Sequence, residues 1–360
     1  MTANSTPLRV GYTIEQCWHT VPGGTAVAAL QIGRELALRD DVDVQLVAGR
    51  HPLPPDEAYT PDGPVHMLPL GRRALYEAWT RLGWPKVESV TGPIDLTHAT
   101  GLVPAATSAT LIVTIHDIAF LHTPERFTRH GARLMSRSLK VANKKAARII
   151  TSSQASFDDL VDHGISADRI RLVPLGVNVL PATADEMASA RAAAGVDEFV
   201  LFVGTIEPRK NLCRLAAAVA ESRLDLPLVV AGAAGWGDVE VPAGSDVRFL
   251  GHVDNSTLRG LYAAATVFAY PSEREGFGLP VAEAMAQSTP VVTSSGTSTE
   301  EVAGGAAVLV DPLDVASIAD GLARAVSRAP DLARRGRTRA GQLSWAAAAD
   351  ATLNAYRELV

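Results

Sequence analysis

The sequence has little cysteine, few aromatic residues and no long hydrophobic run. Cys17 and Cys213 are the two cysteines among 360 residues, and they lie far apart without the spacing of metal ligands. This argues against a disulfide framework, and the count is typical of a reducing compartment. No uninterrupted apolar stretch approaches the roughly 18–20 residues that a membrane-spanning helix needs.

Other absences narrow the function further. The first residues, MTANSTPLRVGYT, lack the basic and apolar regions of a secretory signal, so we expect a cytoplasmic protein, at most peripheral at the inner face of a membrane. The net charge of −6, from 33 basic and 39 acidic residues, argues against nucleic acid as a partner. The nine histidines show no ligand-like spacing, and Asp41-Val42-Asp43 opens an early strand instead of ending one, so we predict no metal site.

Short apolar runs alternate with helix-length segments such as 25–39, 125–146 and 154–163. The runs are rich in Val and Ile and have the length of strands: 8–14, 42–49, 94–100, 109–117, 147–153, 170–176, 199–205, 227–232, 247–251, 266–272, 289–295 and 306–311. This order predicts an α/β fold of doubly wound parallel sheets. We expect two Rossmann-like domains, 1–178 and 179–344, joined near 178–197, with the ligand in the cleft between them.

The stretch SEREGFGLPVAEAMA, from Ser272 onward, is the most specific part of the sequence. A Gly-rich loop follows a strand, and Pro280 stands where a helix would begin, which is the pattern of an anion site. Glu275 in the loop is placed to accept hydrogen bonds from sugar hydroxyls, and Glu283 in the helix to reach a ribose diol. The alternative is an ordinary strand-to-helix turn with solvated acids. The candidate donor-binding residues here are Glu275, Gly276, Phe277, Gly278, Leu279 and Glu283.

Two further places carry candidate chemistry. Arg209 and Lys210, in VGTIEPRKNL, stand where a loop turns into a helix and are suited to clamp a diphosphate, although a solvated basic pair is the alternative. His116 ends a strand of the first domain and is suited to bind a substrate hydroxyl, with a structural histidine as the alternative. Asp117 is expected to cap the next turn, and His98 is a weaker candidate at another strand end.

The pattern E-G-F-G-L-P-x-x-E-A-M-A, with its E-x7-E spacing, closely resembles the signature of family 4 retaining glycosyltransferases, which have the GT-B fold of two Rossmann-like domains. GGTAVAALQIGREL, VTIHDIAFLHTPE, ITSSQASFDDL, VPLGV, VGTIEPRKNL and FLGHV agree in the same order, so the resemblance runs from about residue 8 to residue 358. It implies that the C-terminal helix, 345–360, crosses back to the first domain. Many members have an arginine where this chain has Thr205; here the E-P-R-K-N variant supplies Arg209 and Lys210.

The resemblance also implies roles for single residues. Gly23 and Gly24 match the first-domain loop that approaches the donor phosphate and the acceptor, and His116 matches a histidine beside the transferred sugar. His252 and Val253 match the loop that touches the nucleobase through its backbone. The implied catalytic set is His116, Glu275, Arg209 and Lys210, with no metal and no cofactor.

The expected activity is transfer of a hexose from a nucleotide diphosphate sugar to an acceptor hydroxyl with retention of anomeric configuration, in polysaccharide, glycolipid or glycoconjugate synthesis. The E-P-R-K-N variant favours GDP-mannose as the donor. A Rossmann oxidoreductase is disfavoured because GYTIEQCWHTVPGG does not supply G-x-G-x-x-G. A non-catalytic nucleotide-sugar-binding protein and a GT-B epimerase or phosphorylase stay open as alternatives.

The segment 124–149 carries eight Lys and Arg against one Glu. Such a run is most often a solvated helix face. The alternative is contact with anionic lipid or with a lipid-linked acceptor, which would make the protein peripheral to a membrane.

Overall fold

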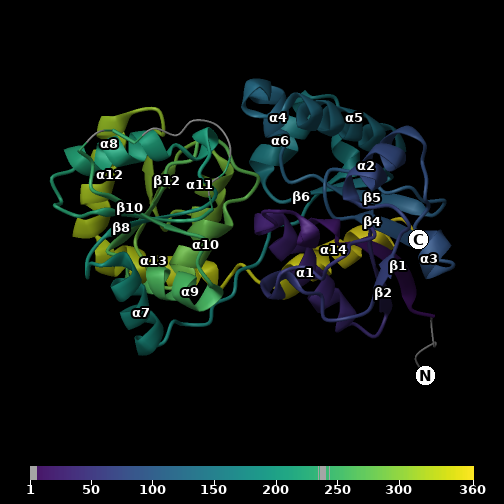
Figure 1. The fold of residues 1–360 in the computed structure, drawn as a ribbon, viewed down its shortest axis with the longest axis horizontal. Helices are drawn as coiled ribbons and strands as arrows, with labels where there is room; N and C mark the ends of the chain where they lie inside the picture. Colours follow the sequence, from purple (N-terminus) through teal and green to yellow (C-terminus); the bar gives the residue numbers. More distant parts are fainter. Residues whose placement is uncertain (1–5, 234, 236–240, 243) are drawn as a thin grey trace. The chain divides into compact units, whose positions relative to one another are not determined.

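The computed structural model of the chain describes residues 6–233, 235, 241–242 and 244–360. The chain divides into two compact units (Figure 1). Unit 1 consists of Met1–Gly176 together with Trp345–Val360, and unit 2 consists of Val177–Ser344. The C-terminal segment therefore packs with the first part of the chain.

Unit 1 is built on a parallel sheet of seven strands in the order β3-β2-β1-β4-β5-β6-β7. The strands are β1 (Leu8–Thr13), β2 (Val42–Ala48), β3 (Val65–Met67), β4 (Leu96–Ala99), β5 (Thr110–Thr114), β6 (Arg148–Thr151) and β7 (Ile170–Leu172). The α-helices are α1 (Gly23–Ala37), α2 (Arg72–Arg81), α3 (Glu88–Thr91), α4 (Ala119–His122), α5 (Arg129–Lys145), α6 (Gln154–Asp162) and α14 (Trp345–Arg357). Short 3-10 turns lie at η1 (Glu15–Trp18), η2 (Glu57–Tyr59), η3 (Pro124–Arg126) and η4 (Ala167–Arg169).

Unit 2 repeats this plan with a six-stranded parallel sheet in the order β10-β9-β8-β11-β12-β13. Its strands are β8 (Val200–Val203), β9 (Leu228–Ala231), β10 (Val247–Gly251), β11 (Val267–Tyr270), β12 (Val291–Ser294) and β13 (Val308–Val310). Its helices are α7 (Ala184–Ala194), η5 (Pro208–Lys210), α8 (Leu212–Glu221), α9 (Asn255–Ala264), α10 (Leu279–Ala286), α11 (Ser298–Ala303), α12 (Val315–Ser327) and α13 (Ala329–Ala340).

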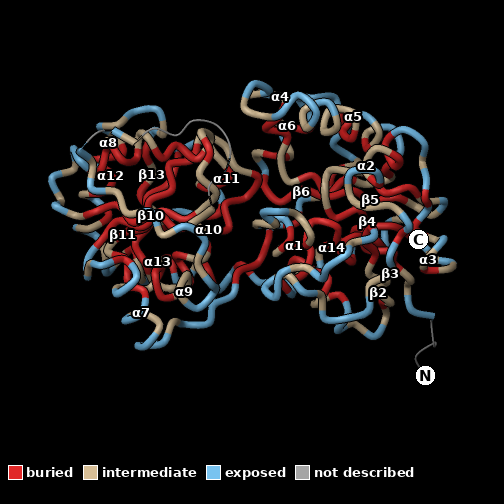
Figure 2. The backbone as a smooth tube through the Cα atoms, viewed as in Figure 1, coloured by how far each residue is buried: buried red, intermediate tan, exposed pale blue. Residues whose placement is uncertain are grey.

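The sheets are the buried centres of their units (Figure 2). Every residue of β4, β8, β9, β11 and β12 is buried. Burial on both faces is why β8, β9 and β11 are nearly continuous apolar runs, whereas β4 and β12 also bury polar side chains. The predicted fold class, two doubly wound α/β units with parallel sheets, is confirmed. The edge strand β3 was not predicted, since none of its three residues is buried and its sequence carries no apolar run.

Helix α14 is fixed to unit 1 by both polar and apolar contacts. It packs against α1. Asp350 forms an ion pair of 2.7 Å with Arg39, which follows α1. Tyr356 is fully buried, and its hydroxyl lies 2.6 Å from His98 Nδ1 at the centre of the sheet. The last helix therefore completes the core of unit 1.

The segment predicted as a linker with a short helix contains α7, which packs against α9 of unit 2. Thr183 and Glu186 form a capping box at its start, and Gly195 ends it in the left-handed conformation. Glu186 also accepts a hydrogen bond of 3.0 Å from Arg259 Nε on α9. Most of the expected linker is thus a structural part of unit 2.

Candidate active site

A compact charged cluster lies where β8 and β11 end in unit 2. Glu275 forms ion pairs of 2.9 Å with Arg209 and 3.0 Å with Lys210, and its side chain is only 9% exposed. Tyr270 and Ser272, at the end of β11, donate hydrogen bonds of 2.9 and 2.8 Å to the same carboxylate oxygen that Lys210 contacts. The predicted Arg209, Lys210 and Glu275 therefore come together, and the alternative of solvated charges is wrong for all three.

Opposing effects set the charge of Glu275. Burial alone would raise the pKa of this carboxyl. The positive charges of Arg209 and Lys210, with the hydrogen bonds from Lys210 and Ser272, outweigh burial and lower the pKa to about 2. Glu275 is therefore a carboxylate at neutral pH, able to accept hydrogen bonds from hydroxyl groups.

The cations are themselves held in place. Arg209 also pairs with Glu207 at 2.7 Å and donates to the carbonyl oxygen of Arg274. Lys210 donates to the hydroxyl of Tyr270 and crosses the Tyr270 ring, with its ammonium 5.0 Å from the ring centre. Two fixed cations on a short turn supply the charge that binding a diphosphate requires.

Helix α10 begins directly after the Gly-rich loop. Gly278 precedes it with φ of +105°, and a Cβ built there would lie 2.7 Å from Thr299 Cγ2, so only glycine fits. Pro280 occupies the first turn, as predicted, and no described side chain caps that turn. The backbone N–H groups that begin at Leu279 therefore leave an N-terminus suited to an anion.

Glu283 has a different environment from Glu275. It is half-buried on α10 and accepts a hydrogen bond of 2.7 Å from the hydroxyl of Tyr262 on α9. Burial raises the pKa of this carboxyl, and the bond from Tyr262 only partly opposes the effect. The two glutamates of the pattern are thus chemically distinct.

The remaining predicted donor residues of unit 2 lie around this edge. Phe277 and Gly276 are buried in the loop, and the carbonyl of Glu275 accepts a hydrogen bond of 2.8 Å from Ser298. His252 is exposed and Val253 half-buried in the turn after β10, two strands away from β8 in the same sheet.

Unit 1 carries the other predicted residues. Gly23 and Gly24 open α1, two residues before the expected start at Thr25, and Gly23 has φ of +60°. His116 follows β5 and is half-buried, and its carbonyl accepts a hydrogen bond of 2.7 Å from Ser156. Burial lowers the pKa of His116, although Asp117 opposes the shift, so the imidazole is neutral at pH 7.

Two neighbouring expectations had opposite outcomes. Asp117 caps the next turn by accepting a bond of 3.0 Å from the N–H of Ala119, as predicted. His98, a candidate for the substrate cleft, is instead buried, with its ring nitrogens 2.6 Å from the hydroxyl of Tyr356 and 2.7 Å from that of Thr114. It is a core residue, because α14 brings Tyr356 to a position that the local sequence does not reveal.

Sequence reasoning missed several residues of the site. Tyr270, Ser272 and Ser298 hold Glu275, and Tyr262 holds Glu283. The position of Tyr270 and Ser272 at the end of a buried strand was a usable signal. Also missed was a cluster of His122, Asp159 and His163 in unit 1.

Comparisons with known proteins agree with this architecture. The family model "Glycosyltransferase Family 4" matches residues 22–179, and the model "Glycosyl transferases group 1" matches residues 197–328. The O-antigen chain mannosyltransferase B of Escherichia coli is 34% identical over 267 residues, which cover 69% of this chain and 70% of that protein. A D-inositol 3-phosphate glycosyltransferase of Acidothermus cellulolyticus is 28% identical, with 93% of this chain and 86% of that protein covered.

Solved structures share the fold over the whole chain. Anabaena HepE in complex with UDP and glucose has a TM-score of 0.74 at 19% identity, covering 98% of this chain and 100% of that one. WaaG, a glycosyltransferase involved in lipopolysaccharide biosynthesis, has a TM-score of 0.70 at 17% identity, covering 96% and 98%. The two Rossmann-like units thus define a GT-B glycosyltransferase fold. The chain belongs to the family 4 glycosyltransferases of glycosyl transferases group 1.

Proposed function

We propose that the protein is a retaining hexosyltransferase that uses a nucleotide diphosphate sugar. The observation that carries this proposal is the joining of Arg209, Lys210 and Glu275 at the carboxyl edge of the unit 2 sheet. Two cations and a carboxylate beside an uncapped helix N-terminus combine the charges that a diphosphate and a sugar need. Membership of a glycosyltransferase family supports the reaction class.

The donor would bind to unit 2 in three parts. Arg209, Lys210 and the N–H groups beginning at Leu279 bind the diphosphate and stabilise the charge that grows on it as the glycosidic bond breaks. Glu275 accepts hydrogen bonds from the sugar hydroxyls. Glu283, held by Tyr262, accepts hydrogen bonds from the ribose.

Glu275 is the counter-ion of both cations. An arriving diphosphate competes for the same guanidinium and ammonium groups, so donor binding loosens the hold on Glu275. The carboxylate then has free lone pairs for the sugar hydroxyls. This exchange links recognition of the phosphates to recognition of the sugar.

His116 contributes a neutral imidazole from unit 1. Its lowered pKa leaves one ring nitrogen as an acceptor and the other as a donor at pH 7. We assign it to the sugar and the incoming acceptor hydroxyl. Gly23 and Gly24 would let the backbone at the start of α1 approach the donor phosphate and the acceptor.

Mannose is the sugar we favour, and GDP-mannose the donor. The E-P-R-K-N variant supports this choice, and so does likeness to a relative named as a mannosyltransferase. Anabaena HepE was solved with UDP and glucose, which makes UDP-glucose the competing donor. We expect the side chains of Arg209 and Lys210 to replace a metal ion as counter-charge.

The experiment is a binding panel followed by product analysis. UDP, GDP, ADP, dTDP and their sugars are tested by thermal shift without divalent cations, and a donor at 100 times its dissociation constant adds about 2.7 kcal/mol of stability. The responding donor is then incubated with acceptor sugars, and the new linkage is assigned by NMR. Transfer with retained configuration supports the proposal. Binding without transfer would favour a non-catalytic binding protein, and a rearranged or phosphorolysed sugar would favour an epimerase or phosphorylase.

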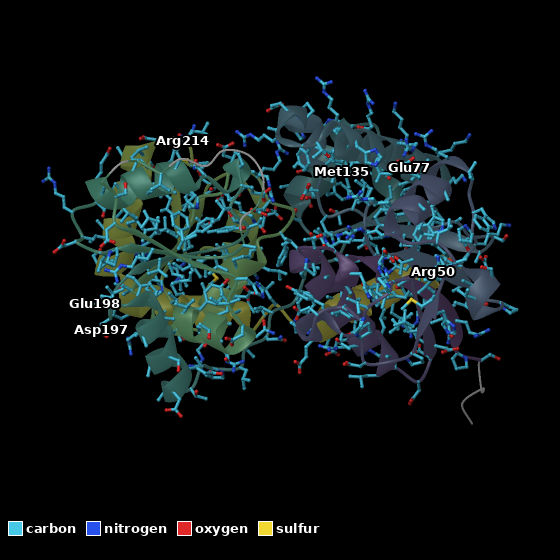
Figure 3. The ribbon with its side chains drawn as sticks, in the orientation of Figure 1. Arg50, Glu77, Met135, Asp197, Glu198 and Arg214 are labelled. Carbon is cyan, nitrogen blue, oxygen red and sulfur yellow. The ribbon has the colours of Figure 1, made fainter. Side chains whose placement is uncertain are left out.

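Helix α5 is a candidate surface for an anionic acceptor or membrane. It buries Ser138, Leu139 and Ala142, and Met135 packs against the core (Figure 3). One cation, Arg137, pairs with Glu77 of α2 at 2.7 Å. The other cations of the helix are exposed: Arg129, Arg133, Lys140, Lys144 and Lys145.

None of the described helices is long and apolar enough to cross a membrane. We propose peripheral contact through the exposed cations of α5 with the phosphates of lipids or of a lipid-linked acceptor. Sedimentation with vesicles tests this proposal. Binding to anionic but not to neutral vesicles supports it, and equal recovery with both contradicts it.

A further inference from the structure

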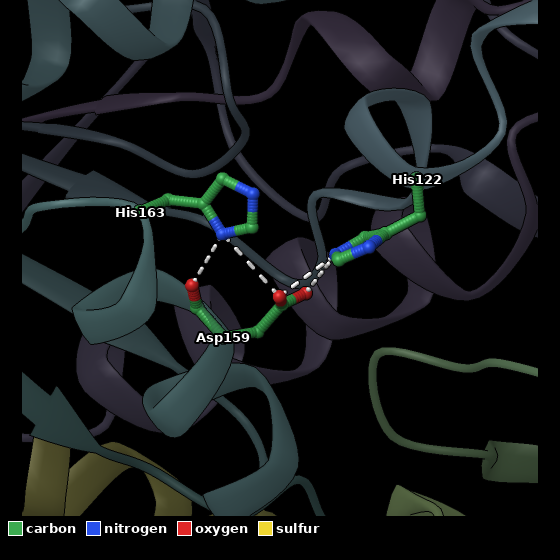
Figure 4. A group of neighbouring side chains, drawn as sticks. All are labelled: His122, Asp159 and His163. Carbon is green, nitrogen blue, oxygen red and sulfur yellow. Dashed lines mark hydrogen bonds and ion pairs between the residues drawn. The ribbon is translucent and has the colours of Figure 1, made fainter.

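Three side chains that are distant in sequence meet on unit 1 (Figure 4). His122 ends α4, whereas Asp159 lies on α6 and His163 directly follows that helix. His122 Nε2 lies 2.7 and 2.9 Å from the two carboxylate oxygens of Asp159. His163 Nδ1 lies 3.4 Å from Asp159 Oδ1 and 2.8 Å from the carbonyl oxygen of Asp159.

These groups form the donor set of a transition-metal site. Two imidazole nitrogens and one carboxylate are ligands that Zn²⁺ takes, whereas Mg²⁺ and Ca²⁺ prefer oxygen ligands alone. One ligand atom from each residue lies within 4.8 Å of the other two. A tetrahedral zinc site with bonds of 2.0–2.1 Å spaces its ligand atoms by about 3.3 Å. The Asp159–His163 separation already has this value, and the Asp159–His122 contact needs only a small widening.

The surroundings favour a cation at this point. The side chains of His122, Asp159 and His163 are 29%, 13% and 32% exposed, so an ion can enter from solvent and a water molecule can complete its coordination. His163 is the C-cap residue of α6, where the helix dipole places partial negative charge. Asp159 adds a carboxylate, which offsets part of the charge of a divalent ion.

We propose that His122, Asp159 and His163 bind one first-row transition-metal ion, with Zn²⁺ as the best fit to the ligand set. In this site His122 Nε2, His163 Nδ1 and a carboxylate oxygen of Asp159 are the three protein ligands, and water is the fourth. To bind the ion, His163 must use the lone pair of its Nδ1. Its hydrogen bond with the carbonyl oxygen of Asp159 is therefore lost when the ion binds. The site lies in unit 1, whereas the proposed phosphate-binding side chains lie in unit 2, and it does not depend on the proposed reaction.

The ion would cross-link the two elements that flank His116. Helix α4 follows His116 and Asp117 along the chain, and Ser156 in α6 donates its hydroxyl hydrogen bond of 2.7 Å to the carbonyl of His116. An ion bound by His122, Asp159 and His163 would therefore join α4 to α6, as the Ser156 hydrogen bond already joins His116 to α6. We assign the site a structural role, since its ion would join two elements and has no established part in the transfer.

The test is calorimetric titration of the metal-stripped full chain with ZnCl₂. Wild type is compared with His122→Gln, Asp159→Asn and His163→Gln. His130→Gln is the matched control, because His130 also lies on unit 1, is 72% exposed and stands outside the cluster, 3.6 Å from Glu77. We expect one Zn²⁺ per chain in wild type and in the control, and affinity reduced by more than about 10-fold in each cluster variant.

Two further readouts keep the result interpretable. Circular dichroism without metal checks that each variant folds. His122 and His163 lie on separate elements, so if one of these two variants does not fold, the other still tests the proposal. Visible absorption of the Co²⁺-loaded protein reports four-coordinate ligation. The proposal is overturned if wild type binds no Zn²⁺, if the cluster variants bind it as wild type does, or if Mg²⁺ binds equally well.

Discussion

The loops after β8 and β11 in unit 2 and the ends of β4 and β5 in unit 1 lie on similar parallel sheets, yet their electrostatics differ. In unit 2, Arg209 and Lys210 surround a carboxylate whose pKa is about 2. In unit 1, burial lowers the pKa of His98 to about 3 and also lowers that of His116, so both rings are neutral. The edge in unit 2 concentrates charge and suits a diphosphate, whereas in unit 1 the neutral ring of His98 is held in the core and the neutral ring of His116 is suited to hydroxyls.

Removing the charge of Glu275 should produce the largest effect. We expect Glu275→Gln to reduce transfer by about 10²–10³-fold, the usual loss when an active-site electrostatic contact is removed. Nucleotide affinity should stay equal or rise, because Arg209 and Lys210 lose their competing counter-ion. Steady-state kinetics and calorimetry with the nucleotide measure the two quantities. Nucleotide affinity that falls together with activity would show that Glu275 does not act on the sugar.

Acid should destabilise unit 2 through the same carboxylate. Because the pKa of Glu275 is lowered from 4.5 to about 2, its ionised form stabilises the fold above pH 4.5, and this contribution disappears as the pH falls towards 2. The shift corresponds to a contribution on the order of 3 kcal/mol. Lys210→Met removes one partner and brings the pKa of Glu275 closer to 4.5, so the melting temperature of this variant should fall less than that of wild type below pH 4.5. Parallel melting curves of the two proteins between pH 7 and pH 3 would contradict the assignment.

Loss of the contact between His98 and Tyr356 should lower the stability of the protein without changing nucleotide binding. Tyr356→Phe leaves His98 Nδ1 without its partner, which costs about 1–3 kcal/mol. Nucleotide affinity should stay within about twofold of wild type, because the proposed phosphate contacts lie in unit 2. Urea unfolding and calorimetry separate these effects. Unchanged stability would mean that His98 is not held by Tyr356.

Chelation should have the smallest effect on transfer. We expect EDTA to change the initial rate by less than about twofold, since Arg209 and Lys210 supply the counter-charge of the diphosphate. A lower melting temperature with unchanged rate would fit loss of an ion from the His122 cluster alone. Activity that disappears with EDTA and returns with Mg²⁺ would contradict metal-independent transfer.

The same contrast explains what the sequence could predict. The strands could be predicted because most buried strands are apolar runs. The contacts of unit 2 could be predicted because Arg209, Lys210 and Glu275 lie in short, distinctive segments next to such strands. The core role of His98 could not be predicted from the sequence, since its partner Tyr356 lies 258 residues away. The cluster was also missed, because His122 and Asp159 are 37 residues apart. The i, i+4 spacing of Asp159 and His163 was a local signal, but such pairs are common on helices.

The most direct test of the central claim is the binding of nucleoside diphosphates to the full chain without divalent cations. Wild type and the double variant Arg209→Met, Lys210→Met are titrated with GDP and UDP by calorimetry. We predict binding of one nucleotide per chain to wild type and a loss of more than about 100-fold in the double variant, because two charge-assisted contacts disappear. Equal affinity in both proteins, or no binding to wild type, would contradict the assignment of this cluster to the donor diphosphate.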